Sequence, residues 1–110
     1  MSTESVSIII PMYNCSDTII QVLDSIRNQT FVEKIQCVIL VNDGSSDNTL
    51  QLVEQYAKYS NFPIKIINKK NGGVASARNE GLRNVGDVDF IAFCDADDLW
   101  LPTKLERQMQ

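Results

Sequence analysis

The sequence predicts an α/β domain in which a doubly wound, mainly parallel sheet carries helices on both faces. Apolar runs typical of strands buried on both faces alternate with segments of helical periodicity along the 110 residues. Polar segments follow directly after the apolar runs, at the strand ends where such sheets bind ligands. The length is that of one domain. These three observations together predict a Rossmann-like architecture.

The first two strand–helix units occupy the N-terminal half of the chain. The run VSIIIPM at residues 6–12 predicts a strand, and apolar residues at helical spacing predict a helix at about residues 16–29, with Ser16 as its N-cap. The run QCVILVN at residues 36–42 predicts the second strand. A second helix is expected at about residues 47–59.

The second half repeats this alternation. PIKIIN at residues 63–68 and DFIAFC at residues 89–94 predict two more strands, with a helix at about residues 74–85 between them and a fourth helix starting in LPTKLERQMQ. We expect four residues of the third helix to face the sheet: Val74, Ala77, Leu82 and Val85. Strict alternation of strand and helix predicts four parallel strands in the order 3-2-1-4.

Composition argues against several classes of function. Ten Lys and Arg against fourteen Asp and Glu give a net charge of -4, and the one basic pair is Lys69-Lys70, so we expect no nucleic-acid partner. The chain has no histidine, which excludes a Ser-His-Asp triad and a zinc site of the Cys/His kind. Cys15, Cys37 and Cys94 are expected to be small buried side chains in a reducing cytoplasm. No apolar run reaches the roughly 20 residues of a membrane span.

Three carboxylates follow the most apolar strand, in FIAFCDADDLW. If the backbone stays extended there, Asp95 and Asp97 point the same way and can grip one divalent cation, Mg²⁺ or Mn²⁺, which prefers oxygen ligands and substrate phosphates. Asp98 stands beside them as a further acid. A helix N-cap with an acidic first turn before Pro102 is the alternative, and it explains Asp98 alone.

Two further strand ends carry groups suited to a nucleotide. In VNDGSSDNT, Asp43 can accept hydrogen bonds from a base or ribose, whereas a turn capped by Ser46 or Asp47 accounts for the remaining residues. In NGGVASARNEGL, the glycine pair lets backbone N–H groups approach a phosphate, and Arg78 can bind either a phosphate or the acidic cluster. Neither GxGxxG nor GxxxxGK[ST] is present, which argues against dinucleotide and P-loop sites.

Four motifs in order, SIIIPMYN, VILVNDGSSDNT, NGGVASARNEGL and FCDADD, resemble the nucleotide-binding half of a family-2 inverting glycosyltransferase with a GT-A fold. The resemblance implies a nucleotide-diphosphate-sugar donor, commonly a UDP-sugar, and a divalent ion, Mn²⁺ or Mg²⁺. It implies that the base and ribose pocket is lined by Pro11, Tyr13 and Asn14, that Asp43 binds the base, and that Arg78 lies close to the donor. It implies that Asp95 faces the ribose or the metal, that Asp97 ligates the metal, and that Asp98 belongs to the same acidic set.

The same resemblance sets expectations for a longer protein. Residues 1–110 correspond to the donor half, whereas the acceptor half and the catalytic base are expected beyond residue 110. The longer enzyme is expected to transfer the sugar with inversion to a glycan or lipid-linked acceptor in cell-surface polysaccharide biosynthesis, in the cytoplasm or at the inner face of the membrane. The alternative is a catalytically inactive nucleotide-binding or regulatory remnant. A phospho-receiver domain fits less well, because its acid pair follows the first strand, where this chain has PMYN. We also expect an exposed apolar edge near the fourth strand, with self-association or marginal stability of the chain.

Overall fold

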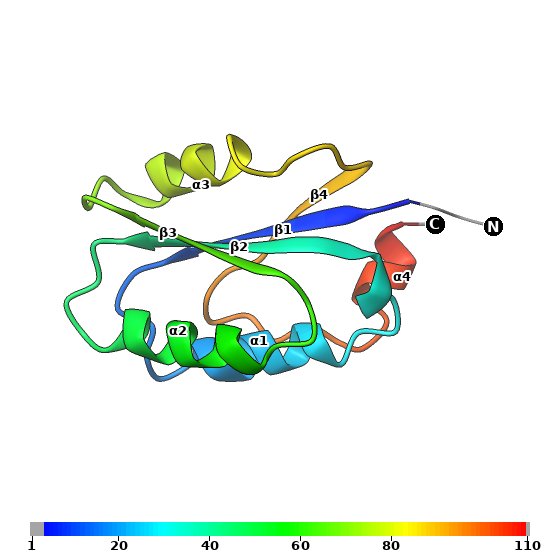
Figure 1. Cartoon of the computed structure of the whole chain (residues 1–110), viewed down its shortest axis with the longest axis horizontal. Helices are drawn as coiled ribbons and strands as arrows, with labels where there is room; N and C mark the ends of the chain where they lie inside the picture. The colour runs from blue at the N-terminus through cyan, green and yellow to red at the C-terminus, as the bar shows by residue number, and fades with distance from the viewer. Residues whose placement is uncertain (1–3, 110) are drawn as a thin grey trace.

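A computed structural model describes residues 4–109 and confirms the predicted sheet. Four parallel strands form one sheet in the order β3-β2-β1-β4 (Figure 1). The strands are β1 (Val6–Met12), β2 (Ile35–Asp43), β3 (Ile64–Lys69) and β4 (Phe90–Phe93). The helices are α1 (Ile19–Arg27), α2 (Thr49–Tyr59), α3 (Val74–Leu82) and α4 (Lys104–Gln108), and a short 3-10 turn, η1 (Val32–Lys34), comes before β2.

The central strand β1 contributes to two cores. Helices α1 and α2 cover one face of the sheet and α3 covers the other (Figure 1). Side chains alternate along β1, so Ile8 and Ile10 pack into the larger core with α1, whereas Ile9 packs into the smaller core with Ala77 of α3. All three isoleucines are fully buried, which explains why this stretch is apolar at every position.

Helix α3 does not present the face that its apolar residues predicted. Val74 and Leu82 are exposed, whereas Ala77 and Gly81 are the buried residues of the helix. The helix lies so close to β1 that a Cβ at position 81 would sit 2.5 Å from Cγ2 of Ile9. Small residues four positions apart therefore form the contact face, and a larger side chain there has no room.

The outer edge of the sheet at β4 is apolar and exposed, which confirms that expectation. Ile91 and Phe93 are 44% and 46% exposed, and Leu99 and Leu101 farther along are exposed as well. A hollow of about 410 Å³ runs along β4 beside Met109. Self-association through this edge stays a prediction. Within residues 4–109, no helix is both long and apolar enough to cross a membrane.

Candidate functional site

The loops that follow β1, β2 and β3 lie together at one end of the sheet, on the left of Figure 1. A hollow of about 390 Å³ is formed there by the loop after β1 and the acidic turn after β4. Its lining residues are Pro11, Tyr13, Asn14, Cys15, Asp17, Thr18, Ala96 and Asp97. The structure thus brings together three of the predicted nucleotide-binding residues and Asp97, one of the three predicted metal ligands, although Asp97 is more than 80 positions away from them in sequence.

Asn14 joins two of these loops. It adopts a positive φ of 49°, a conformation that asparagine tolerates better than most residues. Its side-chain Oδ1 accepts hydrogen bonds from the backbone N–H groups of Ser46, at 2.8 Å, and Asp47, at 3.3 Å, and its own N–H donates to Ser45 Oγ at 2.9 Å. Asn14 therefore has a structural role as well as a place in the hollow.

Asp47 organises the start of both neighbouring helices. Its Oδ1 accepts from Thr49 Oγ1 at 2.6 Å and from Thr49 N at 3.0 Å, and its Oδ2 accepts from the backbone N–H of Ser16 at 3.2 Å. Hydrogen bonds from Thr49 are the main reason that the pKa of Asp47 falls from 3.8 to about 2, although burial opposes them. The N-cap prediction for Ser16 was wrong: residues before Ile19 form turns, and Thr18 is the cap.

This lowered pKa predicts a loss of stability in acid. Because the folded-state pKa of Asp47 lies below the ordinary value, its contribution is fully present above about pH 4 and is lost as the pH falls toward 2. Asp47→Asn is expected to reduce the slope of unfolding free energy against pH in this window, measured by urea denaturation from pH 7 to 2. The exposed Asp87→Asn serves as the control. An unchanged slope in Asp47→Asn would contradict the assignment.

Four residues that line the hollow were not singled out as site residues from the sequence: Cys15, Asp17, Thr18 and Ala96. The predicted helix started too early, at residue 16, which placed Asp17 and Thr18 on a helix rather than in a loop. The sequence did contain a signal, since threonine is a good N-cap residue and Thr18 directly precedes the first buried isoleucine of α1.

Asp43 is buried and accepts three hydrogen bonds from its own chain. Its side chain accepts from Lys69 Nζ at 3.0 Å and from the backbone N–H groups of Gly72 and Gly73, each at 2.9 Å. Burial alone would raise the pKa of this carboxyl, but these hydrogen bonds and the nearby ammonium lower it below its ordinary value. Asp43 is therefore ionised at neutral pH, and it occupies the glycine N–H groups that the sequence had suggested for phosphate.

The acidic segment is a turn rather than an extended strand end. Strand β4 ends at Phe93, and the backbone N–H of Asp98 donates to the carbonyl of Asp95 at 3.1 Å. The expectation that Asp95 and Asp97 point the same way assumed an extended backbone, and that assumption was wrong. Asp97 lines the 390 Å³ hollow, whereas Asp98 lines a separate hollow beside Trp100.

Arg78 contacts the acidic turn from α3. Its guanidinium lies 3.4 Å from Asp95 Oδ1, and its Cζ lies 5.8 Å from the centre of the Phe93 ring. Both partners of the ion pair are well exposed, at 41% and 63%, so the pair contributes little stability by itself. Of the two ligands that the sequence allowed for Arg78, the structure places the acidic cluster within reach.

The carboxylate oxygens of the acidic turn suit a hard cation that also binds a ligand such as a phosphate. Among residues 4–109, no group of three or more acidic or sulfur side chains is arranged to hold a metal, so the carboxylates of Asp95, Asp97 and Asp98 do not form a complete cage. Mg²⁺ and similar ions are usually bound by one or two carboxylates together with substrate phosphates. The exposed Asp97 carboxylate, with Asp95 two residues away, fits that second mode.

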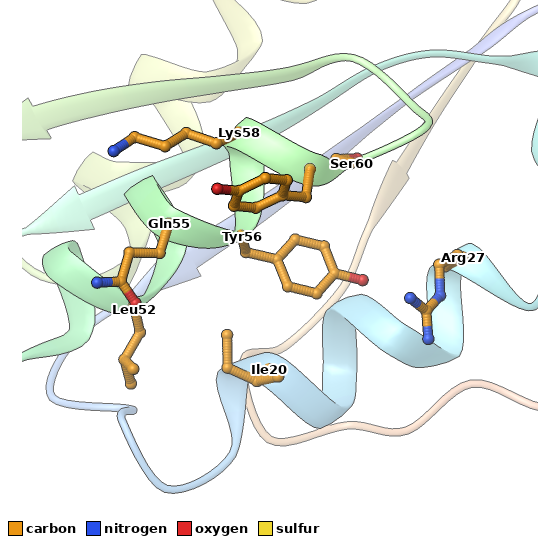
Figure 2. A pocket seen from close by; sticks show the side chains of 8 residues that line it. Ile20, Arg27, Leu52, Gln55, Tyr56, Lys58 and Ser60 are labelled. Atoms are coloured by element: carbon orange, nitrogen blue, oxygen red, sulfur yellow. The ribbon is translucent and has the colours of Figure 1, made fainter.

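A larger hollow, of about 580 Å³, lies elsewhere, between α1 and α2 (Figure 2). Figure 2 shows Ile20 and Arg27 on α1 facing side chains of α2. Tyr56 donates from its hydroxyl to Asp24 Oδ1 at 2.9 Å, and burial together with this carboxylate raises the pKa of Tyr56 to about 12. None of the predicted site residues lines this hollow. The hydrogen bond between Tyr56 and Asp24 instead joins α2 to α1.

Comparison with known proteins identifies the family. Residues 7–110 match the family model described as Glycosyl transferase family 2. The chain belongs to this family. The uncharacterized glycosyltransferase YibD of Escherichia coli (strain K12) is 37% identical over 109 residues, which cover 98% of this chain and 30% of YibD. The chain thus spans about a third of the length of this relative.

Two solved structures share the fold. S. aureus TarS 1-349 in complex with UDP-GlcNAc superposes with a TM-score of 0.84 at 31% identity, over 96% of this chain and 30% of the TarS 1-349 chain. The mannosyltransferase PcManGT of Pyrobaculum calidifontis, in complex with GDP-Man and Mn²⁺, superposes with a TM-score of 0.79 at 30% identity, over 86% of this chain and 28% of PcManGT. The strand order 3-2-1-4 and the GT-A-like fold agree with these likenesses.

Proposed function

We propose that this chain is the donor half of a glycosyltransferase that binds a nucleotide-diphosphate sugar, most simply a UDP-sugar, and transfers the sugar to an acceptor hydroxyl with inversion. The observation that carries the proposal is the hollow that places Pro11, Tyr13 and Asn14 beside Asp97. Membership of the family supports the proposal. So do the two solved structures, because TarS 1-349 binds UDP-GlcNAc and PcManGT binds GDP-Man together with Mn²⁺.

The nucleoside is assigned to the side of the hollow formed by β1. Tyr13 is 55% exposed, so its ring offers an open apolar surface to a base, and Pro11 adds a rigid wall. Asp43 is the proposed acceptor for a base N–H. A carboxylate has about four lone-pair sites, and Asp43 already accepts three bonds from its own chain, which leaves one position.

The diphosphate is assigned to the side formed by the acidic turn. Carboxylates and a diphosphate repel each other, by about 1 kcal/mol per pair of unit charges at 4 Å in water and more in a cleft. A divalent ion held by Asp97, with Asp95 facing the ribose or the metal, supplies a Lewis acid that stabilises the negative charge developing on the leaving diphosphate. Arg78 holds Asp95 at 3.4 Å and brings a further positive charge to this side.

We assign no acceptor site to the residues of this chain. We assign no catalytic base to this chain, because the family base is expected beyond residue 110, and the acceptor is proposed to be a glycan or a lipid-linked sugar. A nucleotide-binding remnant without catalysis is the alternative for this chain. Hydrolysis or transfer of the sugar of UDP-GlcNAc by the longer protein, but not by a variant lacking Asp97, would separate the two.

The donor site is tested by calorimetric titration of UDP, with and without Mn²⁺. We expect wild-type affinity to depend on Mn²⁺, and Asp97→Asn to weaken metal-dependent binding by about 10- to 100-fold, as is typical when a metal site is disturbed. The free energy of unfolding is expected to stay unchanged or rise slightly, because the substitution relieves repulsion with Asp95 and Asp98.

The exposed Asp87→Asn is the matched control, because it removes one carboxylate far from the hollow and has no interaction among the described residues. It should bind UDP as the wild type does. If the turn were merely a helix cap, Asp97→Asn would leave UDP binding unchanged and stability nearly unchanged, because asparagine caps a helix about as well as aspartate. The metal assignment would be refuted if the wild type bound UDP equally well with and without Mn²⁺ and if Asp97→Asn bound UDP as the wild type does.

A further inference from the structure

The side chains of the acidic turn do little to fix its position, because its three carboxylates are exposed. Asp95, Asp97 and Asp98 are exposed, and the turn follows a four-residue strand at the edge of the sheet. The last bond to the neighbouring strand is the one from Cys94 N to the carbonyl of Ile9, at 3.0 Å. A metal ligand on an exposed turn needs support from other parts of the fold, because a carboxylate that samples many positions binds weakly.

One hydrogen bond from another element reaches the middle of this turn. Thr18, the N-cap residue of α1, donates from its hydroxyl to the carbonyl oxygen of Ala96 at 2.7 Å. A second contact of the same hydroxyl, with the carbonyl of Cys15 at 3.4 Å, is longer and weaker. Within the part of the chain that the structure describes, no other helix or strand makes a hydrogen bond to the backbone of Ala96 or Asp97.

This bond acts on the position of Asp97 through covalent geometry. The Ala96 carbonyl belongs to the planar peptide unit that ends at the Cα of Asp97. Fixing the carbonyl oxygen therefore fixes that plane and limits where the Asp97 carboxylate can point. Thr18 and Asp97 line the same hollow, so the bond also joins the proposed nucleoside side to the proposed diphosphate side.

We propose that Thr18 is a positioning residue for the divalent-metal and diphosphate subsite, acting through the Ala96 carbonyl on Asp97. The inference rests on the proposed function, since it needs Asp97 to face a metal. Groups that orient metal ligands typically change metal affinity by about 10- to 100-fold when they are removed. The hydroxyl of Thr18 stands in that relation to Asp97, because it donates to the carbonyl of the preceding residue, Ala96.

Thr18→Val and Thr18→Ser form the test pair. Valine keeps the branched shape and removes the hydroxyl, whereas serine keeps the hydroxyl. With UDP and Mn²⁺, we expect Thr18→Val to bind about tenfold more weakly than wild type and Thr18→Ser to bind within about twofold of it. Affinity for UDP without Mn²⁺ should be the same in all three, because the nucleoside side is unchanged.

Ser7→Ala is the matched control. It also removes a hydroxyl that donates to a backbone carbonyl, that of Val85 at 2.9 Å, but it lies on the first half of β1, away from the hollow. Ser7→Ala should lower the thermal midpoint without changing the effect of Mn²⁺ on UDP affinity. A purely structural role for Thr18 predicts that Thr18→Val behaves in the same way as this control, and that result would overturn the proposal.

A second measurement uses Mn²⁺ alone. Paramagnetic broadening of the amide signals of Asp97 and Asp98 by Mn²⁺ is expected in wild type and Thr18→Ser, and it should need about tenfold more Mn²⁺ in Thr18→Val. Equal broadening in all variants overturns the role of Thr18 while leaving the donor site intact. If wild type shows neither broadening nor metal-dependent UDP binding, the metal assignment in the proposed function fails, and the role of Thr18 fails with it.

Discussion

Replacing Asp43 by alanine is expected to lower the free energy of unfolding by about 3–5 kcal/mol, the usual cost of removing one partner from a buried ion pair. The Asp43 side chain is 6% exposed, and the Lys69 side chain that it binds is 17% exposed. Its loss leaves the ammonium without its counter-ion and leaves the N–H groups of Gly72 and Gly73 without their acceptors. The loop between β3 and α3 then loses two of its hydrogen bonds to β2, whereas the bond from Asn71 Nδ2 to the backbone carbonyl of Asp43, at 3.1 Å, remains.

Urea denaturation at pH 7 measures this effect, with the exposed Asp87→Ala as the control, for which a change within about 0.5 kcal/mol is expected. The difference between wild type and Asp43→Ala should shrink in acid. Because the folded-state pKa of Asp43 is lowered, its stabilisation is present above the ordinary pKa of 3.8 and is lost as the pH falls below it. If Asp43→Ala lowers the free energy of unfolding by less than about 1 kcal/mol at pH 7, with no pH dependence, the prediction is wrong. The attraction within the pair would then not exceed the cost of desolvating the two charges.

The order of elements was predictable because it depends on local periodicity. Every residue of β1 from Val6 to Ile10 is buried and all but Ser7 are apolar, so the run identifies a central parallel strand. The same reasoning gave β2, β3 and β4 within one or two residues of their ends. The order 3-2-1-4 then follows from the rules for connecting parallel strands.

Helix faces and loop geometry were less predictable, because contacts between distant residues decide them. The start of α1 depends on Asp47, which binds the N–H of Ser16 from 31 positions away. The glycine loop depends on Asp43 in the same way, and its N–H groups bind that carboxylate. The acidic motif identified residues that lie near the hollow, but not the turn in which they lie.

Gly81→Ala gives the other large effect that we expect, and it opposes a local preference. Alanine is favoured over glycine inside a helix by about 0.8–1.0 kcal/mol, so propensity alone predicts a more stable protein. The structure predicts the reverse, because the new Cβ would lie 2.5 Å from Cγ2 of Ile9. Ile9 is fully buried in the central strand, and its branched side chain has little freedom to rotate away. Overpacking of this kind costs about 1–3 kcal/mol, so after the propensity gain we expect a net loss of up to about 2 kcal/mol.

Thermal or urea denaturation of Gly81→Ala measures this loss, and Asn79→Ala, on an exposed position of the same helix, is the control that should be neutral or slightly stabilised. A double-mutant cycle with Ile9→Ala tests the contact itself. The cavity left by Ile9→Ala gives the new methyl group room, so the double variant should be more stable than the sum of the two single losses, with a coupling of about 0.5–3 kcal/mol. A stabilised Gly81→Ala with no coupling to Ile9 would mean that α3 can move away from β1. The helix would then be free to carry Arg78 away from Asp95, so the close packing at Gly81 also bears on the proposed donor site.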